Sequence, residues 1–595
     1  MKKLIYIAAC AGAVAFSSCA DNFLDLEPLD AKTDLVYFQT AEQFNEYALG
    51  LYNQLIGWQC RYDGIFDHMD CASDLSTYFS NNNDVGTGTI QVAANSGWWD
   101  NCYGNIRATN MLFQKAAAYP GSQQDIEQPL GEGYFFRAYT YFYLLQHFGG
   151  VPIVTAVLDV DSPELYGSRS SRYDVVEFIL SDLDKAIEYL PNEASIPSSD
   201  KGRISKGGAK AFKARVLLYE ATWRKYNGTS TDFQGSGGPA SDQVNDFLDE
   251  AVSLCEDVMG DSSYSLWNFN ASGEPADEAD AAEMENYMSS RYLFNIEDES
   301  SNPFGKGKDT NHEFVIYSTY DTQRIAGQEI TQTIWKLTAS RKLVDMFLCR
   351  DGLPVEKSPL FKGYEHRGEE FDNRDYRLAS YIGRTDNVAL TGGNSGYTSY
   401  KFAITSRTVA NKDEHHNYPV LRLAEVYLIY AEALFERNGR IEDGQLDRSI
   451  NLLRDRGGVA HLSNAFVQSN GLDMLTEIRR ERTIELYMEG FRYDDLKRWG
   501  QMEAELNESR CGMVVGDADF KTDFVDYDGN AIANLYSPNN YVWGTEKVQA
   551  GEDVPVTCVV CLGSSEISVD KTDYLWPLPS RQIEMNPNLV QNPGY

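Results

Sequence analysis

Long helical segments, each ended by a glycine or proline signal, constrain the fold of this 595-residue chain more than any other feature. Residues 132–148 are apolar on nearly every side and stop at Gly-Gly-Val-Pro, a strong helix terminator. Residues 475–499 form another long helical pattern, interrupted by Gly490. The same patterns predict further helices over residues 103–119, 174–190, 205–226, 419–437 and 445–456.

The predicted helices follow one another as antiparallel pairs of about 35 to 45 residues. This spacing is typical of tetratricopeptide-like stacks, in which each pair buries one face against its neighbour. Residues 431–435 (AEALF), just before Asn438-Gly439, are similar to the end of such a repeat's first helix. The predicted fold class is therefore mainly α, a tetratricopeptide-like helix-hairpin superhelix with a few short strands. An irregular helical domain without repeat geometry is the alternative.

Long segments without clear periodicity separate the helices. They span about 57–100, 227–241, 261–333, 352–416 and 511–573, and the last contains short β-prone runs. Loops this long are unusual in a compact domain unless they carry function. A rigid helical scaffold with a large loop-rich face is a binding architecture.

The N-terminus has the parts of an export signal. Lys2 and Lys3 precede an apolar run over 4–16, and small residues lead to Cys19. The run spans about 20 Å, too short for a bilayer core of about 30 Å. Residues 16–19 (FSSC) resemble a bacterial lipobox, with Phe16 in place of the usual Leu. We therefore predict a signal peptide at 1–18, lipidation of Cys19 and a tether over 19–34, with a soluble secreted protein as the alternative.

The charge of the chain excludes several partners. Removal of residues 1–18 deletes two lysines and no acids, so the net charge moves from −36 to −38. So acidic a protein repels nucleic acid and anionic lipid. The 37 Tyr, 28 Phe and 9 Trp residues supply flat faces on which sugar rings stack, although many of them can be core residues.

The sequence predicts no cofactor and no metal site. Cys558 and Cys561 form a lone C-x-x-C pair without further ligands, which favours a structural disulfide or buried thiols. His415 and His416 are interpreted as residues of a solvated loop. The acidic stretch 277–285 lacks the spacing of an EF-hand.

A set of sequence blocks, in a fixed order behind the lipobox, resembles the SusD/RagB family of outer-membrane nutrient-uptake lipoproteins. Each block is weak alone, but the ordered set covers nearly the whole chain. The blocks lie at 23–28 (FLDLEP), 136–152 (from FRAY to GGVP), 203–219, 422–433, 481–500 (ending in DLKRWG) and 576–595 (from WPLP to NPNLVQNPGY).

This resemblance implies one SusD-like domain over about 35–595, with an N-terminal part at 35–225 and a C-terminal part at 310–595. It implies a four-repeat tetratricopeptide-like scaffold, anchored by lipid and exposed at the cell surface. It also implies capture of oligosaccharides, or sometimes peptides, and their delivery to a SusC-like TonB-dependent β-barrel transporter. The family works without covalent chemistry.

Trp98, Trp99 and Asn101 are the most suggestive candidate ligand contacts. Adjacent tryptophans before a helix cannot both face inward, and Asn101 offers both a donor and an acceptor beside them. The resemblance also implies aromatic contacts in this general region. The alternative is that one tryptophan packs under the helix and the other covers a loop.

Five further residues are candidates in the long loops. Arg61, Asp74 and Tyr78 could form hydrogen bonds with sugar hydroxyls, or they could be solvated loop residues. Trp267 and Trp335 could extend an aromatic surface, or they could be buried.

An enzyme is not predicted. The charges over 477–498 recur at helical spacing and are interpreted as structural ion pairs. The chain has no Gly-x-Ser-x-Gly, His-Glu-x-x-His or Walker sequence. A surface glycoside hydrolase and a purely structural scaffold remain the alternatives.

Overall fold

The computed structural model describes most of the chain between residue 37 and the C-terminus. The predicted signal peptide and tether lie outside the described residues. These are 37–58, 70–78, 83–229, 232–325, 330–334, 337–364, 366, 368–384, 395–410, 413–514, 524–525, 531–532, 543–546 and 556–595.

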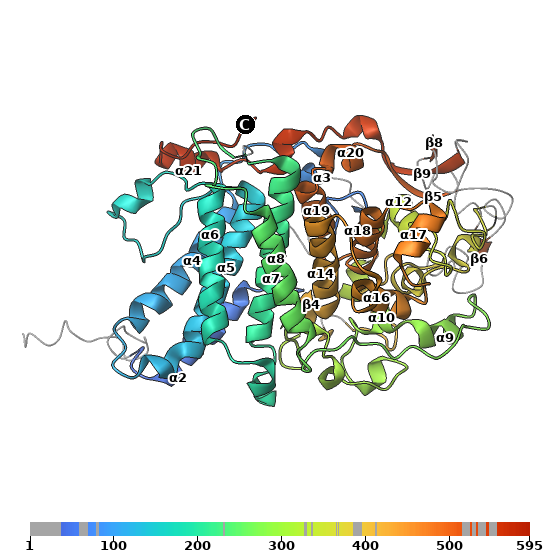
Figure 1. Ribbon diagram of the computed structural model, residues 1–595, viewed down its shortest axis with the longest axis horizontal. Coiled ribbons are helices and arrows are strands. Elements are labelled where there is room, and N and C mark those ends of the chain that lie inside the picture. Colours follow the sequence, from blue (N-terminus) through green and yellow to red (C-terminus); the bar gives the residue numbers. More distant parts are fainter. Residues whose placement is uncertain are drawn as a thin grey trace, which may run out of the picture.

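A row of long helices forms the scaffold (Figure 1). Each helix packs on the next, α4 on α5, α5 on α6, α6 on α7, α7 on α8, and α8 on α14, which then packs on α18. This arrangement confirms the predicted mainly helical fold. The bounds are α4 Gly97–Ala116, α5 Glu127–Phe148, α6 Arg172–Tyr189, α7 Lys206–Asn227, α8 Val244–Met259, α14 Leu423–Asn438 and α18 Met474–Glu485.

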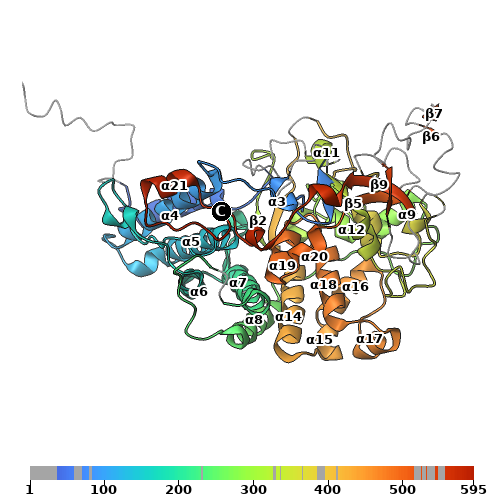
Figure 2. The same cartoon turned by 90° about the horizontal axis from the view of Figure 1, so that it is seen from above.

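Shorter elements lie on both sides of the molecule. Figure 2 shows α8, α14, α15 and α17 on one side of the molecule and β5, β9, α11 and α21 on the other. The shorter helices include α2 Ala41–Leu51, α3 Asp84–Thr87, α10 Ser289–Tyr292, α11 Ile330–Thr333, α12 Arg341–Met346, α13 Tyr376–Tyr381, α15 Asp443–Asp447, α16 Ile450–Gly457, α17 Asn464–Asn470, α19 Arg492–Arg498, α20 Met502–Leu506 and α21 Ser580–Met585.

Antiparallel strands join segments that are far apart in sequence. Strand β1 (Ser76–Tyr78) pairs with β3 (Leu337–Ala339), and β2 (Phe314–Ser318) pairs with β4 (Tyr418–Arg422). Strand β9 (Val556–Leu562) lies between β5 (Arg510–Val514) and β8 (Trp543–Glu546), and β6 (Phe524–Val525) pairs with β7 (Ala531–Ile532). The long predicted loops therefore contain short helices and strands.

Several predicted helix bounds are wrong for identifiable reasons. Helix α4 begins at Gly97 rather than at residue 103, because the Ser96 hydroxyl caps it by accepting from the backbone N–H of Trp99. The predicted helix at 419–437 starts with strand β4, and α14 follows it directly. Helix α8 is absent from the prediction altogether.

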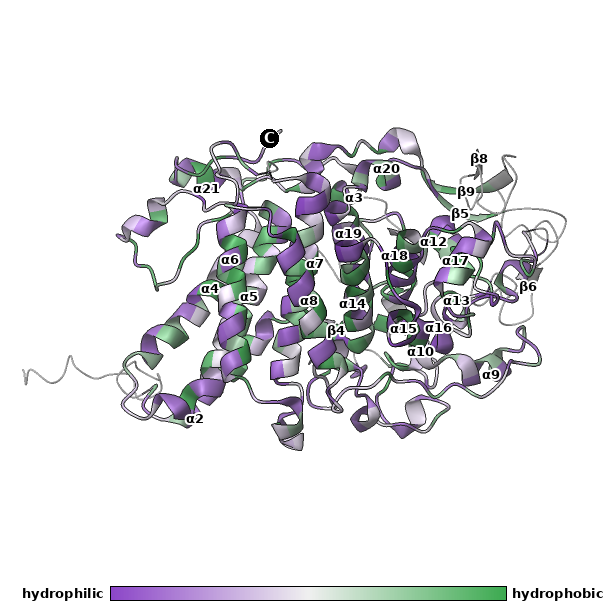
Figure 3. Ribbon diagram, viewed as in Figure 1, coloured by the Kyte–Doolittle hydropathy of each residue, from purple (hydrophilic) through white to green (hydrophobic). Residues whose placement is uncertain are grey.

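Ion pairs link the neighbouring helices. Figure 3 shows much of α14 as hydrophobic. Charged side chains nevertheless cross the helix contacts as pairs. Pairing is what makes burial of these charges tolerable. Four buried pairs are Arg137–Asp182 (2.7 Å, α5 to α6), Arg172–Glu220 (2.7 Å, α6 to α7), Arg215–Glu425 (2.6 Å, α7 to α14) and Arg498–Glu432 (2.6 Å, α19 to α14).

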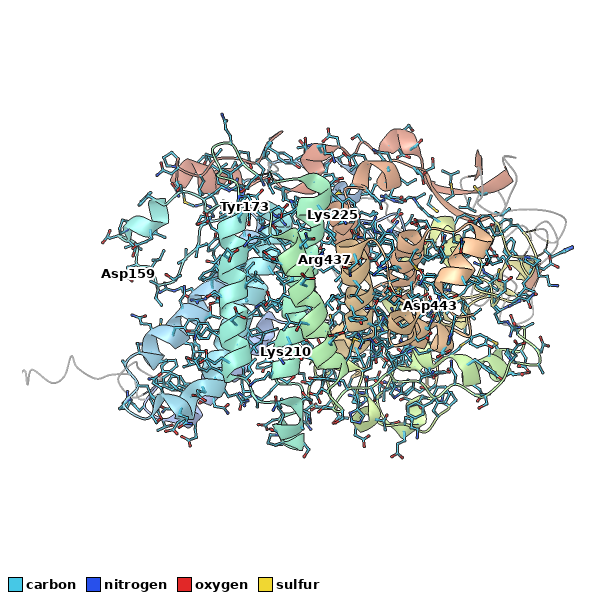
Figure 4. All side chains as sticks on the ribbon, in the orientation of Figure 1. Asp159, Tyr173, Lys210, Lys225, Arg437 and Asp443 are labelled. Atoms are coloured by element: carbon cyan, nitrogen blue, oxygen red, sulfur yellow. The ribbon has the colours of Figure 1, made fainter. Side chains whose placement is uncertain are left out.

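More accessible pairs reinforce the same contacts between α7, α8 and α14. Figure 4 labels three cations, Lys210, Lys225 and Arg437. Each of them forms an ion pair with a carboxylate of a neighbouring helix. The pairs are Lys210–Asp257 (2.5 Å), Lys225–Glu436 (2.7 Å) and Arg437–Asp249 (2.9 Å).

The densest charge cluster surrounds Glu485, at the end of α18. Its carboxylate lies 2.6 Å from Arg422, 2.7 Å from Arg456 and 2.8 Å from Arg377, and all four side chains are fully buried or nearly so. Burial opposes ionisation, but these guanidinium groups hold the pKa of Glu485 well below its usual range. The structural interpretation of the charges over 477–498 is therefore correct.

Membrane-spanning helices are not found: no helix among the described residues combines the length and the apolar character needed to cross a bilayer.

Glu432 provides a test of these buried ion pairs. Burial raises its pKa, but Arg498 and its neighbours outweigh burial and lower the pKa to about 2, from 4.5. The stabilisation from this low pKa is complete above pH 4.5 and is lost as the pH falls toward 2. We expect Glu432→Gln to lower the free energy of unfolding at pH 7 by about 3 to 5 kcal/mol, because Arg498 loses a buried partner.

The measurement is denaturant unfolding at several pH values. The difference between wild type and Glu432→Gln should shrink below pH 4.5. Glu188→Gln is the control, because Glu188 pairs with Lys185 on the exposed surface of α6. Its midpoint should not move, and equal effects of the two variants would contradict the prediction.

Candidate functional site

A cavity of about 530 Å³ opens beside the helical row and is the strongest candidate for a binding site. Its outer part is lined by the segment 83–93 and by Trp98 at the start of α4. Its inner part is lined by α5, α7, β4, α19 and Trp576 of the C-terminal segment. We refer to it as the aromatic cavity.

Four of the aromatic side chains that line the cavity form a connected group. Trp98 lies nearly parallel to Tyr143 and to His147, with ring centroids 5.9 and 5.4 Å apart. Tyr143 and His147 lie one turn apart on α5, so both rings face the same side. Trp576 meets His147 edge-on at 4.2 Å, and its backbone N–H donates to the His147 carbonyl at 2.6 Å.

Polar side chains lie next to the rings. The Gln146 amide donates to Asp494 at 3.1 Å, and Lys497 lies 3.0 Å from the same carboxylate. Asn83 and Gln91 line the outer part of the cavity. Ring faces beside amide and carboxylate groups can stack on a sugar and bind its hydroxyls.

The turn between α18 and α19 forms part of the floor. Phe491 lies between two guanidinium groups, 5.1 Å from Arg215 and 5.2 Å from Arg482. Two residues of this turn have positive φ angles, Met488 at 65° and Gly490 at 79°. The backbone N–H of Met488 donates to buried Asp70 at 2.8 Å, which holds the turn in this conformation.

His147 is neutral at physiological pH. Burial, and then the positive charge of Lys497, lower its pKa to about 4. Its Nδ1 lies 2.7 Å from the Tyr143 carbonyl oxygen, which can only accept. The proton is therefore on Nδ1, and Nε2 keeps a lone pair.

The two predicted tryptophans face different surfaces. Trp98 is half-buried and lines the aromatic cavity, whereas Trp99 is buried and lines a second groove on the other side of α4. They lie inside the first helical turn, where successive residues point about 100° apart. Asn101 is exposed on α4 and is not among the described residues that line the aromatic cavity.

Asp74 and Trp267 are placed inside the protein. Asp74 is 3% exposed and receives two hydrogen bonds from Arg492, which corrects its interpretation as a loop residue open to ligand or solvent. Trp267 is 1% exposed and donates to the Thr310 hydroxyl, in agreement with the buried alternative.

The remaining three candidates are not placed in a site. Tyr78 lies in β1, opposite Leu337. Arg61 and Trp335 lie outside the described residues. Sequence reasoning missed Tyr143, Gln146, His147, Asp494 and Trp576. The four-residue spacing of Tyr143 and His147 in a predicted helix was the available signal, but it equally fits a buried face.

The other chemical candidates are structural. His416 is 1% exposed, and His415 lies 2.9 Å from Glu297, so the prediction of a solvated loop is wrong. Cys558 and Cys561 are buried in β9, and no disulfide joins the cysteines of the described residues. No group of three or more potential metal ligands occurs within the described part of the chain.

Family models match both halves of the chain. Residues 383–595 match the model described as SusD family, and residues 22–218 match the model described as starch-binding associating with outer membrane. The matched regions contain most of the lining of the aromatic cavity.

Individual relatives and solved structures are similar over nearly the full length. A SusD-like protein of Bacteroides ovatus is 24% identical over 99% of this chain and 97% of its own. A SusD-like carbohydrate-binding protein of Bacteroides fragilis has a TM-score of 0.68 at 20% identity, covering 93% of this chain and 99% of that chain. Surface glycan-binding protein A of Bacteroides fluxus has a TM-score of 0.59 at 17% identity, covering 94% and 100%.

The protonation state of His147 can be tested directly. We expect an NMR titration of the histidine rings to give a pKa of about 4 for His147. Lys497→Met should raise this pKa, because the variant removes a cation and leaves Asp494 nearby. An ordinary pKa near 6.5 in the wild type, or no upward change in the variant, would show that His147 is not in this environment.

Proposed function

Because the chain belongs to the SusD/RagB family, we propose that it binds oligosaccharides at the cell surface, without altering them, and passes them to a TonB-dependent transporter. The aromatic cavity is the proposed binding site. The single observation that carries this proposal is the set of Trp98, Tyr143, His147 and Trp576 around a cavity with polar groups at its edge.

Aromatic rings and polar groups match the two kinds of surface on a sugar. The C–H face of a pyranose ring packs on a flat aromatic face, and the hydroxyls at its edge need donors and acceptors. Trp98 and Trp576 are half-buried, so each keeps accessible area in addition to its packing contacts. Gln146, Asn83 and Gln91 supply amides at the edge of the cavity.

The charges of the cavity favour a neutral glycan. Each arginine that lines the cavity among the described residues is paired with a carboxylate of the protein: Arg215 with Glu425, Arg482 with Asp495 and Arg498 with Glu432. The net charge of −36 adds a repulsive field against uronate or sulfate groups.

Two carboxylates of the cavity, Glu489 and Asp494, support binding rather than hydrolysis. A glycosidase needs a general acid whose pKa is raised, beside a second carboxylate. Burial raises the pKa of Glu489, but Arg422 and Lys401 outweigh it and lower the pKa. Asp494 is engaged by Lys497 and Gln146.

The cellular setting in this proposal follows from the family and from the N-terminus. The description of one matching family model supports outer-membrane association. Lipidation of Cys19 and exposure at the cell surface would complete it, with the tether 19–34 joining lipid and domain. No nucleic acid and no cofactor has a part in this function.

Glycan binding can be tested with the soluble protein lacking residues 1–19, by affinity electrophoresis and calorimetry against a panel of neutral and acidic polysaccharides. A neutral glycan should bind and be recovered uncleaved. Trp98→Ala and Trp576→Ala should each weaken binding at least tenfold, because a stacking face is lost.

Tyr166→Ala is the matched control, because Tyr166 is an exposed aromatic residue outside the aromatic cavity. It should leave the affinity unchanged. Unchanged affinity in folded Trp98→Ala and Trp576→Ala proteins would exclude the aromatic cavity as the site. Cleavage of the bound glycan would support the hydrolase alternative.

The anchor has its own test. In cells fed radiolabelled palmitate, the wild-type protein should be labelled and should fractionate with the outer membrane, whereas Cys19→Ala should lose the label. Protease treatment of intact cells should degrade the anchored protein if it faces outward. An unlabelled, periplasmic wild-type protein would contradict the proposal.

A further inference from the structure

A second groove lies on the opposite side of α4 from the aromatic cavity. It encloses about 620 Å³ between α4, the loop that joins α5 to α6, and α21. Trp99, Tyr103, Leu158, Leu165 and Met585 are among its lining residues. We refer to it as the terminal groove.

Three polar side chains in the wall of the terminal groove are already bonded within the protein. The Tyr103 hydroxyl donates to the Pro152 carbonyl at 2.9 Å, and Arg107 donates to the Leu158 carbonyl at 2.6 Å. The Asn586 amide donates to the Gly167 carbonyl at 2.8 Å. Since these donors are committed, the wall offers mainly apolar contacts, which suit hydrophobic side chains better than a sugar.

Exposed hydrophobic residues gather around this groove. Leu165, Tyr166 and Met585, which line it, are 44%, 56% and 52% exposed. Val160 and Val590, on the two segments that border it, are also exposed. Such a cluster on a soluble surface marks an interaction site.

Exposed carboxylates lie on the same segments as the hydrophobic cluster. Figure 4 places Asp159 at the outer edge of the loop between α5 and α6. No ion pair joins these acidic side chains to a cation among the described residues, and Arg107 is the one cation among the described residues that line the groove. The acidic residues are Asp100, Asp159, Asp161, Glu164 and Glu584.

The negative charge around the terminal groove restricts which partner can bind in it. A second copy of this chain would bring the same acidic rim and a net charge of −36 against itself, and anionic lipid would be repelled in the same way. A different protein whose apolar side chains are flanked by Lys or Arg would complement both the groove and its rim.

We infer that the terminal groove docks the transporter of the proposed function, through a surface segment whose apolar side chains are flanked by basic residues. This inference rests on that proposed function. The inference adds to the proposed function the surface of this chain that would contact the transporter. The groove and the aromatic cavity lie on different faces of α4, because Trp98 lines the cavity and the next residue, Trp99, lines the groove. A docked transporter would therefore be adjacent to the bound glycan.

The test uses the full-length, affinity-tagged lipoprotein, purified in mild detergent from the outer membrane of its own host. Quantitative mass spectrometry measures the TonB-dependent barrel that copurifies. The double variant Leu165→Asp/Met585→Asp should retain at least tenfold less barrel than the wild type. Leu360→Asp is the matched control, because Leu360 is exposed but outside the groove, and it should retain the barrel as the wild type does.

Two further measurements separate the possible failures. Thermal unfolding and glycan affinity of the soluble double variant should match the wild type, which would show that the fold and the aromatic cavity are intact. Equal retention of the barrel by wild type and double variant would overturn the docking surface and leave the proposed function standing. Absence of the barrel from the wild-type preparation would overturn both delivery to a transporter and this inference, while glycan binding would stand or fall separately.

Discussion

The rest of the structure depends on the buried charge cluster at Glu485. Its carboxylate accepts from Arg377, Arg422 and Arg456, which come from α13, β4 and α16, and Glu313 shares Arg422 and Arg456 with it. Burial of these charges is compensated only when every partner is in place. A shifted helix or strand would leave an unpaired charge in the core, so the cluster favours one arrangement of segments that are distant in sequence.

The position of the aromatic cavity follows from this constraint. The chain leaves Glu485 and turns at once, so Glu489 and Phe491 line the cavity only a few residues later. Glu489 accepts from Arg422, and Asp70 bonds the backbone of Met488 and Arg492. The floor is therefore fixed by the core before any ligand arrives. A preformed floor lowers the ordering cost of binding, which matters when each sugar contact contributes little.

The sequence predicts most of the long helices, although not α8, because their periodicity and end signals are local. Helix α5 ends where its glycines predict, with Gly149 at a φ of 73°. The site is harder to predict, because its aromatic residues also fit a buried face and become neighbours only through tertiary packing. Trp576 reaches His147 from more than 400 residues away, and the ion pair that buries Asp74 comes from Arg492. Neither contact leaves a local pattern.

Two short segments divide the aromatic cavity from the terminal groove, and each contributes to both. In the first turn of α4, the helical rotation of about 100° per residue directs the adjacent tryptophans to different faces. In the C-terminal segment, Trp576 lines the cavity, and Gln582, six residues later, lines the groove. This segment is bonded to the backbone at His147, Ala93 and Ala94. A glycan bound to Trp98 and Trp576 and a protein bound to Trp99 and Met585 would therefore contact different faces of the same two segments. The two partners would not compete for one surface.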